Sequence, residues 1–181
     1  MAKTSIENKI RKLNNQVAKL QDEIAKESKK AFKQMTKDIF KKYPDLKSFA
    51  WNQYTPYFND GEVCSFGAYI DYISINGSEE YECLYDIESL AEEVENKDKT
   101  IAKLQKEMKK EPEWRIQYLK ERIEEINNTD IKEITHKRNM FNDIVHCLSL
   151  IHENALKQMF GDHVSVTVSR KGVTTEKYQH D

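Results

Sequence analysis

The first 43 residues carry a regular stripe of aliphatic side chains. Residues 10, 17 and 24 of the stripe are β-branched and suit the a positions of a heptad, while the others, mainly leucine, suit the d positions, a combination typical of parallel dimers. The spacing between members alternates between four and three residues, which places them on one face of a helix. The members are Ile6, Ile10, Leu13, Val17, Leu20 and Ile24. Residues 1–43 are therefore expected to form an amphipathic helix, ended by Pro44, that acts as an oligomerisation arm.

Residues 46–85 change to a pattern that is typical of β-structure. Phe49 and Trp51 alternate with polar neighbours, and a β-rich run extends from Val63 to Ile75. Turn formers separate these runs, at residues 59–61 and again at Asn76-Gly77. We expect this β-segment to form two strands folded back on each other.

Helical periodicity returns over residues 86–160. A stripe from Ile87 to Met108, interrupted at Lys97, predicts a second coiled-coil-like helix, and the pattern continues beyond a break at Glu111-Pro112. A last helix is expected from roughly Ile131 to Phe160. It becomes apolar on more than one face after Met140, which makes it the best candidate for a buried central helix.

The chain ends in a pattern that predicts a hairpin over residues 163–178. Residues 163–168 alternate with a period of two, Arg170-Lys171-Gly172 favours a turn, and residues 173–178 can return as a strand. The predicted class is α+β. Residues 44–181 are expected to hold a small antiparallel sheet of two hairpins packed on the central C-terminal helix, with long helices projecting from it.

Composition and net charge limit the classes of partner that the sequence predicts. Charged residues make up 33% of the chain and hydrophobic residues 38%, and the formal net charge is −2, so no global attraction to nucleic acid or an anionic membrane is expected. No apolar run approaches the roughly 20 residues of a membrane-spanning helix, and the N-terminus shows no hydrophobic signal core. Cys64, Cys83 and Cys147 form no C-x-x-C pair. A cytoplasmic protein without a membrane partner is expected.

Charge is distributed unevenly along the chain. Residues 1–43 carry twelve basic and five acidic side chains, or +7, whereas residues 60–98 carry one basic and twelve acidic side chains, or −11. The favoured interpretation is that these two segments attract each other within the fold or across an oligomer. The alternative is an arm that grips phosphate. Specific nucleic-acid binding is not expected under the favoured interpretation.

The sequence offers no established catalytic or cofactor motif. The five histidines show no metal-ligand spacing such as H-E-x-x-H, and no phosphate-binding glycine loop or G-x-S-x-G elbow is present. We therefore assign no catalytic residue, no metal and no cofactor.

The candidate binding site is the dense aromatic segment from Trp51 to Phe66. Aromatic rings with amide and hydroxyl neighbours suit a planar ligand with a polar edge, and the turn of the C-terminal hairpin supplies two further candidates. The candidate ligand- or partner-binding residues are Trp51, Gln53, Tyr54, Tyr57, Asn59, Asp60, Arg170 and Lys171. The same aromatic residues would equally serve as the core of a small sheet, and both interpretations stay open.

The segment W-x-Q-Y-T-P-Y-F-N-D-G-x-x-C-x-F, from Trp51 to Phe66, resembles a block in uncharacterised proteins of bacteriophages and some bacteria. Phe160-Gly161-Asp162-His163-Val164 resembles a second piece. The resemblance implies a phage context, hence a host cell cytoplasm, and carries over no catalytic residue.

The leading hypothesis is a non-enzymatic, homo-oligomeric, phage-type binding protein that binds or sequesters a host protein or a nucleotide-like signal, as in counter-defence. One alternative is a structural or adaptor coiled-coil protein without a small-molecule site. A second alternative is a phosphodiesterase or nuclease-like enzyme that uses dispersed acids and His163.

Overall fold

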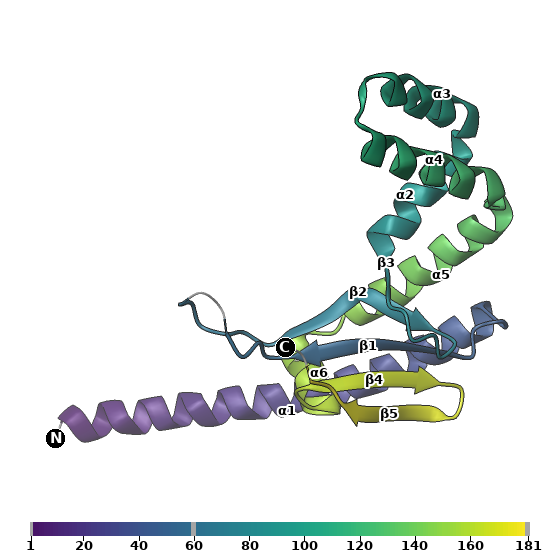
Figure 1. Ribbon diagram of the computed structural model, residues 1–181. Coiled ribbons are helices and arrows are strands. Elements are labelled where there is room, and N and C mark those ends of the chain that lie inside the picture. Colours follow the sequence, from purple (N-terminus) through teal and green to yellow (C-terminus); the bar gives the residue numbers. More distant parts are fainter. Residues whose placement is uncertain (1, 59–60, 180–181) are drawn as a thin grey trace.

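A single five-stranded antiparallel sheet forms the centre of the protein (Figure 1). The computed structural model describes residues 2–58 and 61–179 and confirms the α+β class. The strands run in the order β3-β2-β1-β4-β5. Their bounds are β1 Ser48–Tyr54, β2 Gly67–Ile75, β3 Glu82–Cys83, β4 Val164–Ser169 and β5 Gly172–Lys177.

Some of the helices cover one face of the sheet, and others form a projection that extends away from it. α1 runs along the sheet and extends beyond it at its N-terminal end, while α2 to α5 form a helical projection that rises away from the strands (Figure 1). The bounds are α1 Ala2–Lys42, α2 Leu84–Glu95, α3 Lys97–Glu107, the 3-10 turn η1 Met108–Lys110, α4 Glu113–Asn128, α5 Ile131–Ser149 and α6 Glu153–Phe160.

The two expected hairpins, β1–β2 and β4–β5, are joined into one sheet by pairing of β1 with β4. Alternation along the central strands directs apolar side chains to the helices, so Trp51 and Val166, which face each other across β1 and β4, are both 0% exposed. The opposite face is polar. There the Tyr81 hydroxyl hydrogen-bonds with Asn52 and Ser165.

The predicted central helix is confirmed in α5, where Phe141, Ile144 and Leu148 are each 0% exposed. The last part of α1 joins the same core, because Phe32 and Phe40 are 4% and 7% exposed. The expected arm of residues 1–43 is therefore one helix with two environments. Only the portion before Phe32 projects as an exposed arm.

The single helix expected after residue 86 is in fact divided into α2 and α3 at Asn96. The Asn96 side-chain amide donates to the carbonyl oxygen of Glu92, a local bond that competes with helix continuation. The break lets α3 fold back beside α4. The apolar face of α2, including Ile87 and Val94, packs on α5, so the α2 part of this second stripe is buried within the chain, whereas none of the α3 residues is buried.

The helix expected from Ile131 to Phe160 is also divided, at residues 150–152. Its start is as predicted, because the Asp130 carboxylate accepts from the backbone amides of Lys132 and Glu133. The break arises where His152 caps a new helix by accepting from the amide of Asn154. Ile151, in the connection between α5 and α6, is 4% exposed and packs in the core. α6 is capped at its C-terminal end by Gly161.

Candidate functional site

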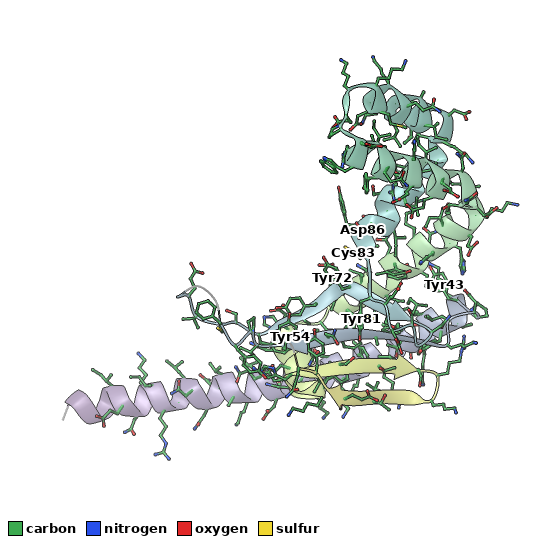
Figure 2. All side chains as sticks on the ribbon, viewed as in Figure 1. Tyr43, Tyr54, Tyr72, Tyr81, Cys83 and Asp86 are labelled. Atoms are coloured by element: carbon green, nitrogen blue, oxygen red, sulfur yellow. The ribbon has the colours of Figure 1, made fainter. Side chains whose placement is uncertain are left out.

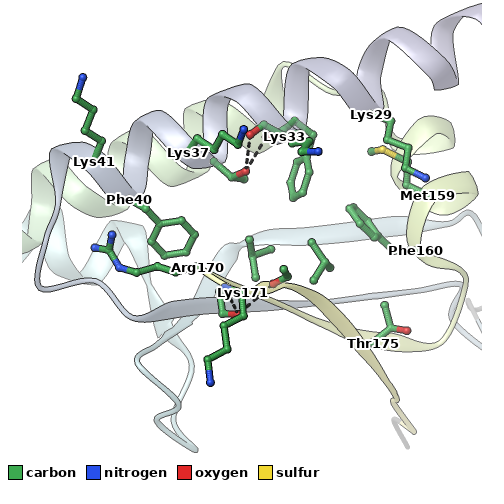
Figure 3. A pocket seen from close by; sticks show the side chains of 16 residues that line it. Lys29, Lys33, Lys37, Phe40, Lys41, Met159, Phe160, Arg170, Lys171 and Thr175 are labelled. Carbon is green, nitrogen blue, oxygen red and sulfur yellow. Dashed lines mark hydrogen bonds between the residues drawn. The ribbon is translucent and has the colours of Figure 1, made fainter.

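A groove of about 780 Å³ lies between α1 and the C-terminal hairpin (Figure 3). The helix supplies one wall, while the end of α6, β4 and β5 supply the floor and the opposite wall. Its lining residues are Lys29, Phe32, Lys33, Thr36, Lys37, Phe40, Lys41, Met159, Phe160, Val168, Ser169, Arg170, Lys171, Gly172, Val173 and Thr175. A volume of this size falls within the range of small-molecule and peptide sites.

Cations follow the groove along α1. Lys29, Lys33, Lys37 and Lys41 recur every fourth residue, so they form one row on the helix that extends over about 18 Å. Arg170 and Lys171 add two more cations from the opposite wall, and the lining contains no Asp or Glu. The groove therefore concentrates positive charge in a chain whose net charge is negative.

The floor of the groove is apolar. Met159, Phe160 and Val173 are partly or largely exposed there, whereas Phe32 and Phe40 present little surface because both are nearly buried. Basic rims over an apolar floor suit a ligand that is both anionic and amphipathic.

Arg170 is anchored to the end of α1. Its guanidinium group donates to the carbonyl oxygens of Tyr43 and Pro44, at 3.2 and 3.1 Å, and lies 5.3 Å from the centroid of the Phe40 ring. These contacts hold the turn of the β4–β5 hairpin against the C-terminal end of α1, at one end of the groove. Lys171, the next residue, is exposed and points away from the helix (Figure 3).

The predicted pairing of the basic and acidic segments within the fold does not occur among the described residues. The acidic segment pairs instead with α4 and α5, through Glu82 with Lys137, Glu93 with Arg122 and Glu95 with Arg138. No described carboxylate lies within ion-pair distance of the lysine row on α1. The charge of the lysine row is therefore not neutralised by the carboxylates that the structure describes.

Two of the predicted binding residues belong to the core. Trp51 and Gln53 are each 0% exposed, and the Trp51 indole N–H donates to the Gln53 side-chain oxygen at 3.2 Å. The Gln53 amide donates in turn to the carbonyl oxygens of Leu156 and Gly161. These side chains present no surface to a ligand in this structure, since their polar atoms are used within the fold.

The other predicted aromatics lie at or beyond the C-terminal end of β1 and are not among the residues that line the groove. Tyr54, labelled in Figure 2, stacks on Tyr69 with ring centroids 4.3 Å apart, and burial together with the Tyr69 hydroxyl raises the pKa of Tyr54 to about 12. Tyr57, 66% exposed, stacks on His163 at 4.8 Å. Asn59 and Asp60 lie outside the described residues. Of the eight predicted binding residues, the groove contains Arg170 and Lys171.

The two segments that carry the phage-like resemblance meet around Asp162. Its carboxylate accepts from the backbone amide and the hydroxyl of Thr55, both at 2.8 Å, from the amide of His163 and from Lys157. Burial acts to raise the pKa of Asp162, but these bonds outweigh it and lower the pKa to about 2. The carboxylate is ionised and saturated with donors, which suits a structural tie better than an acid or base in catalysis.

Other candidate chemistry is sparse in the described ranges. They contain no group of three or more His, Cys, Asp or Glu placed to hold a metal ion. Cys147 is buried, and burial raises the pKa of its thiol to about 11, so it is a poor nucleophile. Cys83 lies at the foot of the helical projection beside Tyr72 (Figure 2).

Sequence reasoning missed most of the groove. The four-residue repeat of lysines from Lys29 to Lys41 was the available signal, but the nearby carboxylates Glu27 and Asp38 made it resemble an ordinary solvated face. No sequence pattern indicated that the C-terminal hairpin would lie opposite this row.

No family model, curated protein or solved structure matches the chain. The described part of the chain contains no helix with the length and apolar character required to cross a membrane.

Replacing Trp51 should destabilise the protein far more than replacing Tyr57. Trp51→Ala removes a fully buried ring, which we expect to lower the free energy of unfolding by about 3–5 kcal/mol, whereas Tyr57→Ala on the surface should change it by less than about 1 kcal/mol. Urea denaturation followed by circular dichroism measures both. Equal stabilities of the two variants would contradict the packing role of Trp51.

Asp162→Asn should produce a pH-dependent loss of stability. Because the folded-state pKa of Asp162 is lowered to about 2 from an ordinary 3.8, ionised Asp162 contributes stability above about pH 4, and this contribution disappears as the pH falls through 2. We expect the variant to be less stable by about 1–2 kcal/mol at pH 7 and the difference to shrink between pH 4 and 2. Urea denaturation of both proteins across this pH range tests whether the Asp162 hydrogen bonds stabilise the fold, with Asp38→Asn as the control. A difference that is constant with pH would refute it.

Proposed function

We propose that the protein is a non-enzymatic binding protein that assembles as a homo-oligomer through α1 and holds an anionic partner in the basic groove. The partner is a molecule of the host, either a protein segment or a nucleotide-like signal, in keeping with a phage-type role in counter-defence. The phage context and the cytoplasmic location rest on the resemblance of the Trp51–Phe66 segment. The observation that carries the binding role is the uncompensated charge of the groove.

Electrostatics support this role for the groove. Six cations gather around an apolar floor, and none of the carboxylates in the described residues neutralises the lysine row. Like charges gathered in a cleft repel each other, so the arrangement weakens the free protein slightly and is relieved when an anion binds. A structural adaptor without a binding site would gain nothing from such an arrangement.

Exposure of the N-terminal stripe supports assembly. The six aliphatic residues from Ile6 to Ile24 are between 52% and 61% exposed, and no described helix or strand lies alongside this portion of α1 (Figure 1). A bare helix with a continuous apolar stripe is marginal in water, and pairing with a second copy would cover the stripe.

Assembly and binding use different faces of α1. Lys33 follows Ile24 by nine residues, which at 3.6 residues per turn is two and a half turns, so the lysine row lies opposite the aliphatic stripe. A second copy paired along the stripe therefore leaves the groove open to its partner.

The wild-type protein should be a dimer or larger in solution, and Leu13→Asp should reduce its size. The subunit mass is 21.4 kDa, and light scattering at micromolar concentration measures the assembly directly. A charge in the seam cannot be buried without a partner, so the variant should approach the mass of one subunit. Asn15→Asp adds the same charge on the opposite face of the helix and should leave the mass unchanged. A wild-type monomer would overturn the proposed assembly.

Charge reversal in the groove should abolish anion binding. The probe is the aromatic sulfonate dye anilinonaphthalene sulfonate, which is anionic and apolar. Lys33→Glu with Lys37→Glu should weaken dye binding about tenfold or more and reduce its dependence on salt. The control, Lys12→Glu with Lys19→Glu, changes the net charge equally on the exposed arm. If both pairs of substitutions weaken dye binding equally, the groove is not the binding site.

A further inference from the structure

The groove leaves room for one more helix over the sheet. On β4, Val166 and Val168 are 0% and 2% exposed because they pack in the core beneath the rings of α1. Their direct partners on the edge strand β5, Thr175 and Val173, are exposed. One face of the sheet is thus covered at β4 and open at β5. Neighbouring helices pack with axes about 8–10 Å apart, so the open position beside α1 suits a single helix.

The lysine row matches the repeat of a helix laid beside it. Successive lysines from Lys29 to Lys41 rise about 6 Å along α1, and carboxylates at every fourth residue of a partner helix rise by the same amount. Each cation can then face one carboxylate along the whole contact. A strand added to the edge of β5 would instead lie in the plane of the sheet, away from these lysines.

The floor favours an aliphatic surface over a nucleotide base. Its exposed part consists of Met159, Val173 and part of the Phe160 ring, and apolar groups of this kind accept the apolar side of a helix. Base recognition normally uses an open aromatic face. The Phe160 ring, however, packs edge to face with Phe32 and Trp51, at centroid distances of 5.2 and 5.6 Å. Phe40 is 7% exposed and has the Arg170 guanidinium above its ring.

We infer that the groove is a docking site for an acidic amphipathic helix of another protein, which lies beside α1 over β5 with its carboxylates on the lysine row and its apolar side on Met159, Phe160 and Val173. This inference rests on the proposed function and names the class of partner that the same groove receives. The partner completes the helical layer of the sheet, and its charge neutralises the row that the chain itself leaves unpaired.

The test uses the full-length protein and a labelled synthetic peptide of roughly 16 residues, about 24 Å long as a helix, with Glu at every fourth position and Leu on the adjacent face. A second peptide has the same composition in an order that destroys the helical period. Fluorescence anisotropy should show the amphipathic peptide binding at least about tenfold more tightly than the reordered one. Circular dichroism should show that it gains helix on binding.

Two sets of variants locate the contact. Lys33→Glu with Lys37→Glu should weaken binding about tenfold or more, and a peptide with Lys in place of Glu should bind this variant better than the wild type. Such recovery requires a folded variant, so it separates lost contacts from lost structure. Val173→Asp should weaken binding through the floor without changing the lysines, and Lys12→Glu with Lys19→Glu should leave binding unchanged.

The remaining outcomes separate the inference from the proposed function. If both peptides bind equally, or if ATP or a single-stranded oligonucleotide occupies the groove more tightly than the amphipathic peptide, the helix-docking inference is wrong while groove-dependent dye binding still supports an anion site. If neither the dye nor the peptides depend on Lys33 and Lys37, the proposed function fails with it.

Discussion

The rings of Phe32, Trp51 and Phe160 pack edge to face, with centroids 5.2–6.4 Å apart. One ring comes from α1, one from the central strand and one from the end of α6, and each such pair contributes about 0.5–1.5 kcal/mol beyond its buried area. This contact holds α1 against the sheet and sets the point at which α1 extends beyond the sheet. Before Lys29 the helix extends as an exposed arm, and from Lys29 to Lys41 it forms one wall of the groove.

The sequence predicted the elements of the fold better than their ends. Alternation along the strands and the three-four spacing of the helices were sufficient for the two hairpins, for the long first helix and for a buried helix after Met140. The breaks at Asn96 and at residues 150–152 were not predicted, because each is marked by a local hydrogen bond of a single side chain, from Asn96 to the Glu92 carbonyl oxygen and from the Asn154 amide to His152. The aliphatic stripe is interrupted at Lys97, beside the first break, but one polar position does not distinguish a helix end from a solvated site. At the second break the apolar residues Leu148 and Ile151 carry the pattern onward.

The site was harder to predict, since core and binding residues share the same chemistry. Trp51 and Gln53 looked like ligand contacts because an indole beside an amide suits a polar aromatic ligand. The fold uses that pair internally, with Gln53 joining Trp51 to the carbonyl oxygens around α6. The groove depends on residues more than a hundred positions apart, Lys33 on α1 and Val173 on β5, whose proximity follows only from the pairing of β1 with β4.

The two faces of α1 give the proposed assembly a property that neither face has alone. In a parallel dimer joined along Ile6 to Ile24, the lysine rows point outward on opposite sides, so one dimer presents two grooves that do not compete for space. A partner that displays two acidic helices can then bind both grooves of one dimer. The second contact forms at the high effective concentration created by the first, which strengthens binding without any new residue. In the proposed dimer, two modest grooves would together hold such a partner more firmly than either groove alone, so the arm would contribute to binding through assembly.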